Sequence, residues 1–215
     1  VAVDTETTST DPLIASLVGI SLCVESDTAF YISINHQYAE NLEIEFVIKH
    51  LSEILKNKKI IGHNLKYDLL VLENHGWIIE NELFDTMIAS YLLNPSAMRH
   101  NLDACVEEEF SHHMIPITEL IGTGKKQITF DLVEQESASV YAAEDACFTY
   151  RLFSVYQERL VKNNLYQLFL NMEMPLLRVL MSMEKTGVYI DSLILKDLSK
   201  MINRITADII SQTTK

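Results

Sequence analysis

The stretch Val1-Ala2-Val3-Asp4-Thr5-Glu6-Thr7-Thr8 opens the chain. Its apolar and β-branched residues alternate with polar ones, which predicts a buried strand over Val1–Glu6. Side chains two positions apart on a strand point to the same face, so Asp4 and Glu6 project together at the end of this strand. Two neighbouring carboxylates in a buried place cannot both stay ionised unless something compensates their charge.

The segments that follow predict a mixed α/β domain. Apolar runs at 17–24 and 29–34 are separated by the polar residues 25–28, which predicts a β-hairpin. Beyond the hairpin, short strands alternate with segments of helical periodicity. We expect helices over 46–56, 65–75, 86–93, 102–110 and 136–162, the last long enough to contain a break, and strands over 59–62 and 83–84. Residues 111–135 are expected to be irregular. Such an order favours a mixed sheet flanked by helices.

Residues 164–215 predict a helical tail of different composition. Residues 1–163 hold 25 acidic and 11 basic residues, whereas 164–215 hold 5 and 6. This change predicts a domain boundary near Asn163 and Asn164. The tail's first helix carries one apolar stripe, and Pro175 should kink it. The methionines of 172–183 are expected to lie in a core. The stripe consists of Leu168, Met172, Leu176, Val179, Leu180 and Met183.

Four carboxylates stand out by their position in these elements. Besides the pair on the first strand, Asp68 lies in the first turn of a helix that follows a strand, and Asp145 lies on the long helix. Tyr141 is one turn before Asp145 and shares its face. Any one of these acids alone would be an ordinary cap or turn residue. Together they predict a site for hard divalent cations, and two such ions are the usual partners of phosphoryl displacement.

Three short motifs resemble those of the DnaQ-like 3′–5′ exonucleases. They are Val3-Asp4-Thr5-Glu6-Thr7-Thr8, Gly62-His63-Asn64-Leu65-Lys66-Tyr67-Asp68 and Tyr141-Ala142-Ala143-Glu144-Asp145. The third motif has the tyrosine form called DEDDy. The order and spacing of all three carry the resemblance, since each motif alone is weak. The resemblance implies an RNase H-like fold and an active, metal-dependent nuclease.

The resemblance is narrower still, to the proofreading exonuclease domain of bacterial DNA polymerase I, a family A polymerase. Further similar stretches are Phe84-Asp85-Thr86-Met87, Arg99-His100-Asn101-Leu102-Asp103, 122–130, Glu173-Met174-Pro175 and 183–191. The last two resemble the junction at which the polymerase domain begins. We therefore expect an exonuclease domain over 1–163 and a truncated, helical start of the polymerase domain over 164–215. That tail is too short to polymerise DNA.

The resemblance also implies a role for each site residue. Asp4 should bridge two Mg²⁺ or Mn²⁺ ions, with Glu6 and Asp145 completing the ligands of the first. Asp68 should hold the second ion, largely through water. Tyr141 should orient the attacking water, because a phenol with a pKa near ~10 is a poor base at neutral pH.

The implied substrate is the 3′ end of single-stranded DNA, cleaved to nucleoside 5′-monophosphates during replication or repair. Residues that should contact the frayed strand are Thr5, His63, Asn64 and Arg99. Two positions depart from the family pattern. Thr10 stands where the family often has an apolar wedge, and Ile117 stands where some relatives have an aromatic. Both departures predict weaker stacking on the bases.

Two other functions stay open at this point. A stand-alone exoribonuclease of the RNase D type shares the three motifs, although the tail and the glycine–lysine loop at 122–126 favour the polymerase domain. A catalytically inactive scaffold or single-strand-binding platform is the other, and the complete set of acids argues against it.

Composition limits the mode of binding. The chain has 215 residues and a formal net charge of −13, which is unusual for a nucleic-acid binder. Such a domain should hold only a few nucleotides, weakly, through metals and local contacts, and depend on the rest of its own polymerase chain for duplex binding. Three widely spaced cysteines indicate a reducing, cytoplasmic setting. We expect no membrane span and a monomer.

Overall fold

A five-stranded mixed sheet forms the centre of the fold. The computed structural model describes residues 1–25 and 28–213. Its strands are β1 (Ala2–Thr7), β2 (Leu17–Glu25), β3 (Thr28–Ser33), β4 (Ile60–Gly62) and β5 (Leu83–Asp85), in the order β3-β2-β1-β4-β5. β2 lies antiparallel to β1 and β3, which confirms the hairpin, while β4 is parallel to β1 and β5. The expected hairpin turn includes Ser26 and Asp27, which lie outside the described residues.

The helices follow the predicted order with small shifts at their ends. The α-helices are α1 (Ile44–Leu55), α2 (Leu65–Asn74), α3 (Thr86–Leu93), α4 (Leu102–Phe110), α5 (Ile117–Ile121), α6 (Gln135–Lys162), α7 (Tyr166–Leu168), α8 (Met174–Thr186) and α9 (Ser192–Thr213). The stretch expected to be irregular, 111–135, contains α5 and the two 3₁₀ turns η1 (Gly124–Lys126) and η2 (Phe130–Leu132). α6 runs for 28 residues without a break.

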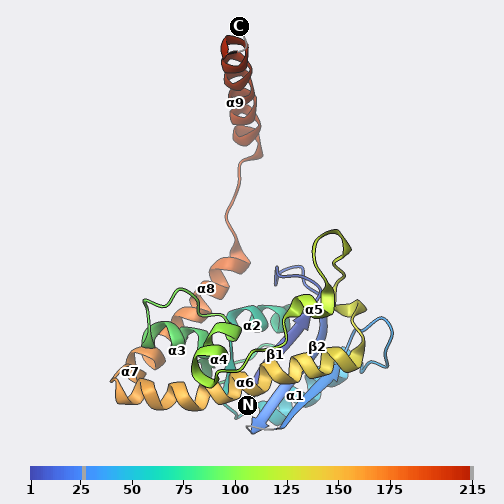
Figure 1. Cartoon of the computed structure of the whole chain (residues 1–215), viewed down its shortest axis with the longest axis vertical. Coiled ribbons are helices and arrows are strands. Elements are labelled where there is room, and N and C mark those ends of the chain that lie inside the picture. The colour runs from blue at the N-terminus through green and yellow to red at the C-terminus, as the bar shows by residue number, and fades with distance from the viewer. Residues whose placement is uncertain (26–27, 214–215) are drawn as a thin grey trace. The chain divides into compact units, whose positions relative to one another are not determined.

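The long helix α6 packs along the sheet and fixes the site against it. It contacts β1, β2, β3 and β4, and Figure 1 shows it running beside the strands. Ala138, Ala142 and Ala146 repeat every four residues on its sheet-facing side and are fully buried. Their small side chains let the helix backbone approach the strands closely, so side chains from α6 and β1 can meet.

A β-bulge lies at the end of β1. Glu6 pairs with Gly19, whereas Thr7 pairs with Leu17, so Val18 is the extra residue on β2. Bulges bend a strand and re-aim the side chains beside them. The bulge therefore lies directly beside Glu6 on β1.

The chain divides into two compact units, Val1–Met181 and a second that begins at Ser182. The first includes α7, the π-helical turn η3 (Phe169–Glu173) and most of α8. Phe169 is fully buried, with its ring centroid 4.6 Å from that of Phe84 on β5. Arg178 donates to the carbonyls of Ile79 and Asn81 at 2.8 and 3.0 Å. The compact unit thus ends at Met181, while the functional boundary near Asn163 stays a prediction.

The expectation that the methionines of 172–183 lie in a core is right for Met174 and Met181 and wrong for Met172 and Met183. All six side chains of the tail's apolar stripe are exposed, and the buried ones are Phe169, Met174, Leu177 and Met181. The reason lies at Pro175, which lacks an N–H group to continue the α-helical ladder. The chain accommodates it with the π-helical turn η3 just before α8, and the wider turn changes which face of the helix meets the core.

The second unit contains the end of α8 and the helix α9. Asp191 caps α9, accepting hydrogen bonds from the backbone N–H groups of Leu193 and Ile194 at 2.9 and 3.3 Å. In the part of the chain that the structure describes, no helix is both long and apolar enough to cross a membrane.

Candidate active site

Three of the predicted carboxylates meet where α6 crosses β1. Ligand oxygens of Asp4, Glu6 and Asp145 all lie within 4.8 Å of one another. Asp4 and Asp145 are half-buried and Glu6 is buried. The two strand residues share a face because they are two positions apart, and α6 brings Asp145 to that face from a distant part of the sequence.

Burial, with repulsion between the acids added to it, raises the pKa values of this cluster. Burial raises the pKa of Asp4 to about 6. The pKa of Glu6 is well above its usual value, chiefly because of burial and then because of the charges of Asp4, Asp145 and Asp68. Burial and the Asp4 charge likewise raise the pKa of Asp145. Such a cluster favours the binding of either protons or a cation.

Asp68 is beside the cluster but turned toward the backbone. Its Oδ1 accepts hydrogen bonds from the Thr5 backbone N–H at 3.0 Å and from the Thr5 hydroxyl at 2.6 Å. Burial raises its pKa, and the charge of Asp4 raises it further, which places the two carboxylates near each other. Asp68 thus braces the end of β1 between Asp4 and Glu6.

Asp85 holds the helix that carries Asp68. It caps α3, accepting from the N–H groups of Met87 and Ile88 at 2.8 and 3.2 Å, as the sequence predicts. The same carboxylate also accepts from the N–H groups of Asn64 and Leu65 at 3.3 and 2.8 Å. One buried side chain therefore serves the N-termini of both α2 and α3, because the parallel strands β4 and β5 end side by side.

Tyr141 lies one helical turn before Asp145, as its spacing predicts. Burial raises the pKa of the Tyr141 hydroxyl, and the neighbouring Asp145 carboxylate raises it further. A hydrogen bond links the two side chains. The phenol is therefore protonated at neutral pH, and it can donate a hydrogen bond but cannot act as a base.

The donors present fit a divalent cation. Three carboxylate oxygens converge, which is the ligand chemistry that Mg²⁺ and Mn²⁺ prefer. Glu6 Oε1 is buried and has no hydrogen-bond partner among the described residues. A buried acceptor without a partner is costly, and a bound cation would satisfy it.

An open cleft of about 650 Å³ leads to Glu6. Its walls come from the end of β1 and the loop after it, from the start of α2, and from the segment that holds α5 and η1. The lining residues are Thr5–Thr10, Asn64, Tyr67, Ile117, Ile121, Gly124 and Gln127–Phe130. Thr10 and Ile117, the two departures from the family pattern, both line this cleft. The glycine–lysine loop also reaches it through Gly124, beside the exposed Lys125 and Lys126.

The four predicted strand-binding residues have different surroundings. Asn64 is exposed in the cleft and adopts a left-handed backbone conformation, with φ 61°, as the cap of α2. Thr5 lines the cleft, but its hydroxyl is bonded to Asp68. Arg99 is exposed in the loop between α3 and α4 and is not among the residues that line the cleft.

His63 has both ring nitrogens bonded within the protein. Nε2 contacts the His100 carbonyl oxygen and Nδ1 contacts the Thr86 hydroxyl, each at 2.9 Å. Burial lowers the pKa of His63 to about 4, so the ring is neutral at physiological pH. Since the carbonyl can only accept, the proton is on Nε2, and His63 holds the loop that carries Arg99.

Tyr67 is a cleft residue that the sequence reasoning missed. Its hydroxyl bonds to the Thr7 hydroxyl and to the Ser9 carbonyl, which tethers the loop after β1 to α2. The motif around Asp68 contains this tyrosine, but its tether crosses about 60 residues of sequence and leaves no local signal. Tyr67 thus shapes the wall of the cleft beside Glu6.

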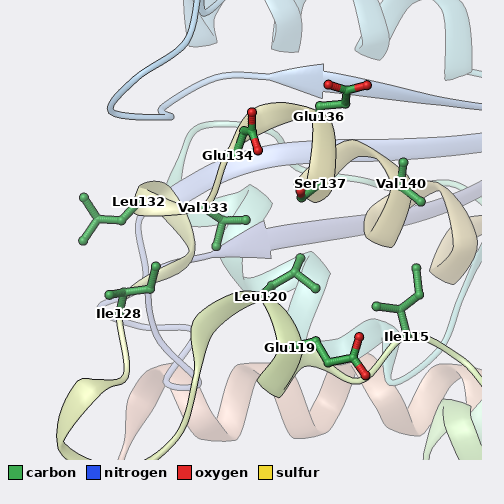
Figure 2. Close-up of a pocket in the computed structure, with 10 residues that line it drawn as sticks. All are labelled: Ile115, Glu119, Leu120, Ile128, Leu132, Val133, Glu134, Glu136, Ser137 and Val140. Carbon is green, nitrogen blue, oxygen red and sulfur yellow. The ribbon is translucent and has the colours of Figure 1, made fainter.

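A second cavity, of about 540 Å³, lies between α5 and the start of α6. Figure 2 shows its apolar lining, to which Ile128, Leu132 and Val140 contribute, together with the carboxylates of Glu119, Glu134 and Glu136. Three carboxylates at this cavity would repel phosphate groups. This cavity is therefore poorly suited to a phosphate-bearing strand.

Comparison with solved structures places the fold among nucleases. The chain is similar to NrnC from Brucella melitensis with bound Mg²⁺ (TM-score 0.67, 23% identity, 86% of this chain and 85% of that one). It is also similar to Escherichia coli RNase D, an exoribonuclease (TM-score 0.64, 19% identity, 85% and 44%). A third similar structure is the POL domain of Pol1 from M. smegmatis (TM-score 0.72, 18% identity, 95% and 32%). These likenesses confirm the RNase H-like fold.

Sequence comparison gives the family. The family model described as "3′–5′ exonuclease" matches residues 1–160. The chain is 37% identical to DNA polymerase I of Rhizobium leguminosarum, over 93% of this chain and 22% of that protein. It is 36% identical to DNA polymerase I of Chloroflexus aurantiacus, over 98% and 23%. It spans about a fifth of the length of these relatives. The chain belongs to the 3′–5′ exonuclease family found within bacterial DNA polymerase I.

Proposed function

We propose that this chain is a 3′–5′ exonuclease that removes nucleotides from the 3′ end of single-stranded DNA. One observation carries the proposal: Asp4, Glu6 and Asp145 converge beside an open cleft, and one buried oxygen of Glu6 has no hydrogen-bond partner in the part of the chain that the structure describes. Membership of the exonuclease family gives this arrangement its chemistry. The relatives' name, DNA polymerase I, favours DNA as substrate and proofreading during replication or repair as the role.

The proposed site holds two divalent ions, Mg²⁺ or Mn²⁺. Asp4, Glu6 and Asp145 would hold the first, and Asp4 and Asp68 the second, with Asp68 acting largely through water. When bound, such ions activate a water molecule and neutralise charge on the reacting phosphate. Asp68 has one oxygen committed to Thr5, which suits a residue that contributes at longer range.

The chain's own residues position the reactants. The Tyr141 hydroxyl keeps its proton, which it donates to Asp145, so its oxygen would accept a hydrogen bond from the attacking water and orient it. Asn64 and the loop Thr7–Thr10 line the cleft in which the terminal nucleotides would lie. Thr10 and Ile117 offer little stacking surface, so binding of the strand is weak and depends on the metal site. The exposed Lys125 and Lys126, next to the cleft residue Gly124, would contact phosphates of the strand, and the exposed Arg99 would do so outside the cleft.

The deciding experiment compares DNA with RNA. Single strands of one sequence, labelled at the 3′ end, are incubated with the chain and Mg²⁺, and products are separated by chromatography. We expect nucleoside 5′-monophosphates from DNA at once, none in chelator and none from Asp145→Ala. The variant Glu53→Gln removes one acidic charge at an exposed site on α1 and should match the wild type.

Two results would change the proposal. Faster release from RNA than from DNA would favour an exoribonuclease of the RNase D type. Single-strand and metal binding without any release would favour an inactive scaffold.

Tyr141→Phe tests the role of the hydroxyl. We expect kcat to fall about tenfold, the factor that corresponds to about 1.4 kcal/mol of lost transition-state stabilisation, with little change in KM. Steady-state kinetics on labelled single-stranded DNA measures both constants. An unchanged kcat, or a loss confined to KM, would show that the hydroxyl does not act in the chemical step.

A further inference from the structure

Three strands present one continuous row of side chains beside the carboxylates. Asp4 on β1 pairs with Ser21 on β2, and Ser21 pairs with Tyr31 on β3. Directly paired residues on antiparallel strands point to the same face. In the next row, Glu6 pairs with Gly19. Tyr31 therefore projects from the same face of the sheet as the two acids.

The absence of a side chain at Gly19 lets Tyr31 approach Glu6. A Cβ atom at Gly19 would lie 2.1 Å from the Tyr31 hydroxyl oxygen, so the phenol occupies that space. Its hydroxyl thus lies over the residue opposite Glu6. Burial raises the pKa of Tyr31, and the charges of Glu6 and Asp4 raise it further, as expected for a phenol next to both acids.

His36 accepts the hydrogen bond that this hydroxyl donates. The Tyr31 oxygen lies 2.6 Å from His36 Nε2, and His36 Nδ1 lies 3.2 Å from the Val133 carbonyl oxygen. The carbonyl can only accept, so Nδ1 carries the hydrogen. Burial lowers the pKa of His36, and a neutral imidazole has a single N–H group. Nε2 therefore accepts, and Tyr31 donates its only proton to His36.

His36 is held in this orientation from both sides. Asn41 Oδ1 accepts from the His36 backbone N–H at 2.9 Å, and Asn41 Nδ2 donates to the His36 carbonyl at 2.8 Å. The histidine is 4% exposed, and its ring lies against that of Phe130.

We propose that His36 and Tyr31 are positioning residues that keep the buried oxygen of Glu6 free to bind a divalent cation. With His36 present, the Tyr31 proton points away from Glu6, whose Oε1 has no hydrogen-bond partner in residues 1–25 and 28–213. Without His36, that proton would be free to turn toward the two carboxylates whose charges act on Tyr31, Glu6 and Asp4. The resulting charge-assisted hydrogen bond would compete with the cation. The inference rests on the proposed function, since it assumes a cation at Glu6.

The test is a double-variant comparison with metal affinity as its readout. Mn²⁺ binding to the whole chain is measured by electron paramagnetic resonance, which needs no substrate. We expect His36→Leu to raise the Mn²⁺ dissociation constant about tenfold, the usual scale of one such hydrogen bond. Adding Tyr31→Phe to His36→Leu removes the competing proton and should restore the affinity to within about threefold of wild type.

A purely structural role would give the opposite order, because two substitutions in one packed region should weaken binding more than one. The inference is overturned if the double variant binds Mn²⁺ as weakly as His36→Leu does. It is also overturned if His36→Leu alone binds Mn²⁺ with wild-type affinity. If His36→Leu does not fold, His36→Gln serves, because an amide can donate to Val133 and accept from Tyr31. A folded His36→Gln should bind within about threefold of wild type, and a tenfold loss contradicts the proposal. Wild-type protein that binds no Mn²⁺ contradicts the proposed function itself.

Discussion

Replacing Asp4 by asparagine should abolish exonuclease activity, by about 10³-fold or more, while making the metal-free protein more stable. Asp4 is the member of the cluster whose charge acts on Glu6, Asp68 and Asp145 alike. Its removal costs the cation a shared ligand, and several kcal/mol of transition-state stabilisation depend on that cation. The same change relieves repulsion among buried carboxylates. A loss of function with a gain of stability distinguishes an active-site residue from a structural one.

The stability change should depend on pH in a defined direction. Burial raises the pKa of Asp4 from its ordinary 3.8 to about 6, so the folded protein holds a proton that the unfolded chain has released. Stability is then undiminished below pH about 4 and falls as pH rises through about 6. The pKa values of Glu6 and Asp145 are also raised by burial and neighbouring charges, so their ionisation changes stability in the same direction. Denaturant unfolding in chelator at pH 5 and pH 8 measures this slope, which Asp4→Asn should flatten.

Two controls make the result decisive. Added Mg²⁺ should raise the stability of the wild-type protein at pH 8, because a ligand stabilises the state that it binds. It should leave the stability of Asp4→Asn unchanged, because that variant has lost the carboxylate ligand. Glu53→Gln, which removes one exposed acidic charge on α1, should leave both activity and the pH slope as they are. Asp4→Asn with wild-type activity would show that the cluster is not the catalytic site.

Asp85→Ala should be the most destabilising of the capping changes. It leaves four backbone N–H groups without their acceptor, two at the start of α2 and two at the start of α3. Because Asp85 is 1% exposed, water cannot easily replace it. We expect a loss of about 3–5 kcal/mol in the free energy of unfolding, more than the ~1 kcal/mol of an ordinary cap.

The chain offers a graded series for this measurement. Asp191 makes the same pair of capping bonds at α9, where the helix is exposed, so Asp191→Ala should cost about 1 kcal/mol or less. Asp85→Asn keeps one acceptor oxygen for α3 but turns an amide N–H₂ toward Leu65. Its loss of unfolding free energy should lie between the losses of Asp85→Ala and Asp191→Ala. Equal losses of unfolding free energy for Asp85→Ala and Asp191→Ala, measured with urea, would show that Asp85 does not stabilise both α2 and α3.

Local patterns in the sequence predicted the elements and the convergence of the acids. Asp85 before Thr86 is a typical N-cap, and alternation over Val1–Glu6 predicted the strand that places Asp4 beside Glu6. The second role of Asp85 had no local signal, because it depends on β4 and β5 lying in parallel register. The same holds for Tyr31, whose approach to Glu6 requires the antiparallel register that sets Gly19 opposite the acid.

Errors arose where packing overrides periodicity. The apolar stripe that begins at Leu168 is exposed, whereas the buried face begins at Phe169 and continues, across the π-turn before Pro175, at Met174 and Leu177. Helical periodicity assumes a constant number of residues per turn, so one wide turn shifts every later position. The break expected in the long helix is absent from α6. Charged residues interrupt the apolar face of α6 in the sequence, but the helix continues past them along the sheet.

The unbroken course of α6 also limits how this domain can change in length. At 1.5 Å per residue its 28 residues extend about 42 Å, and one side of the helix carries Asp145 near its middle and Leu152, Tyr156 and Leu160 beyond. One residue inserted after Asp145 would rotate everything beyond it by about 100°, so either the acid or the buried side chains would lose their places. Insertions should therefore be tolerated in the loops around α5. Between Tyr141 and Leu160, by contrast, an insertion or deletion should disrupt either the site or the core.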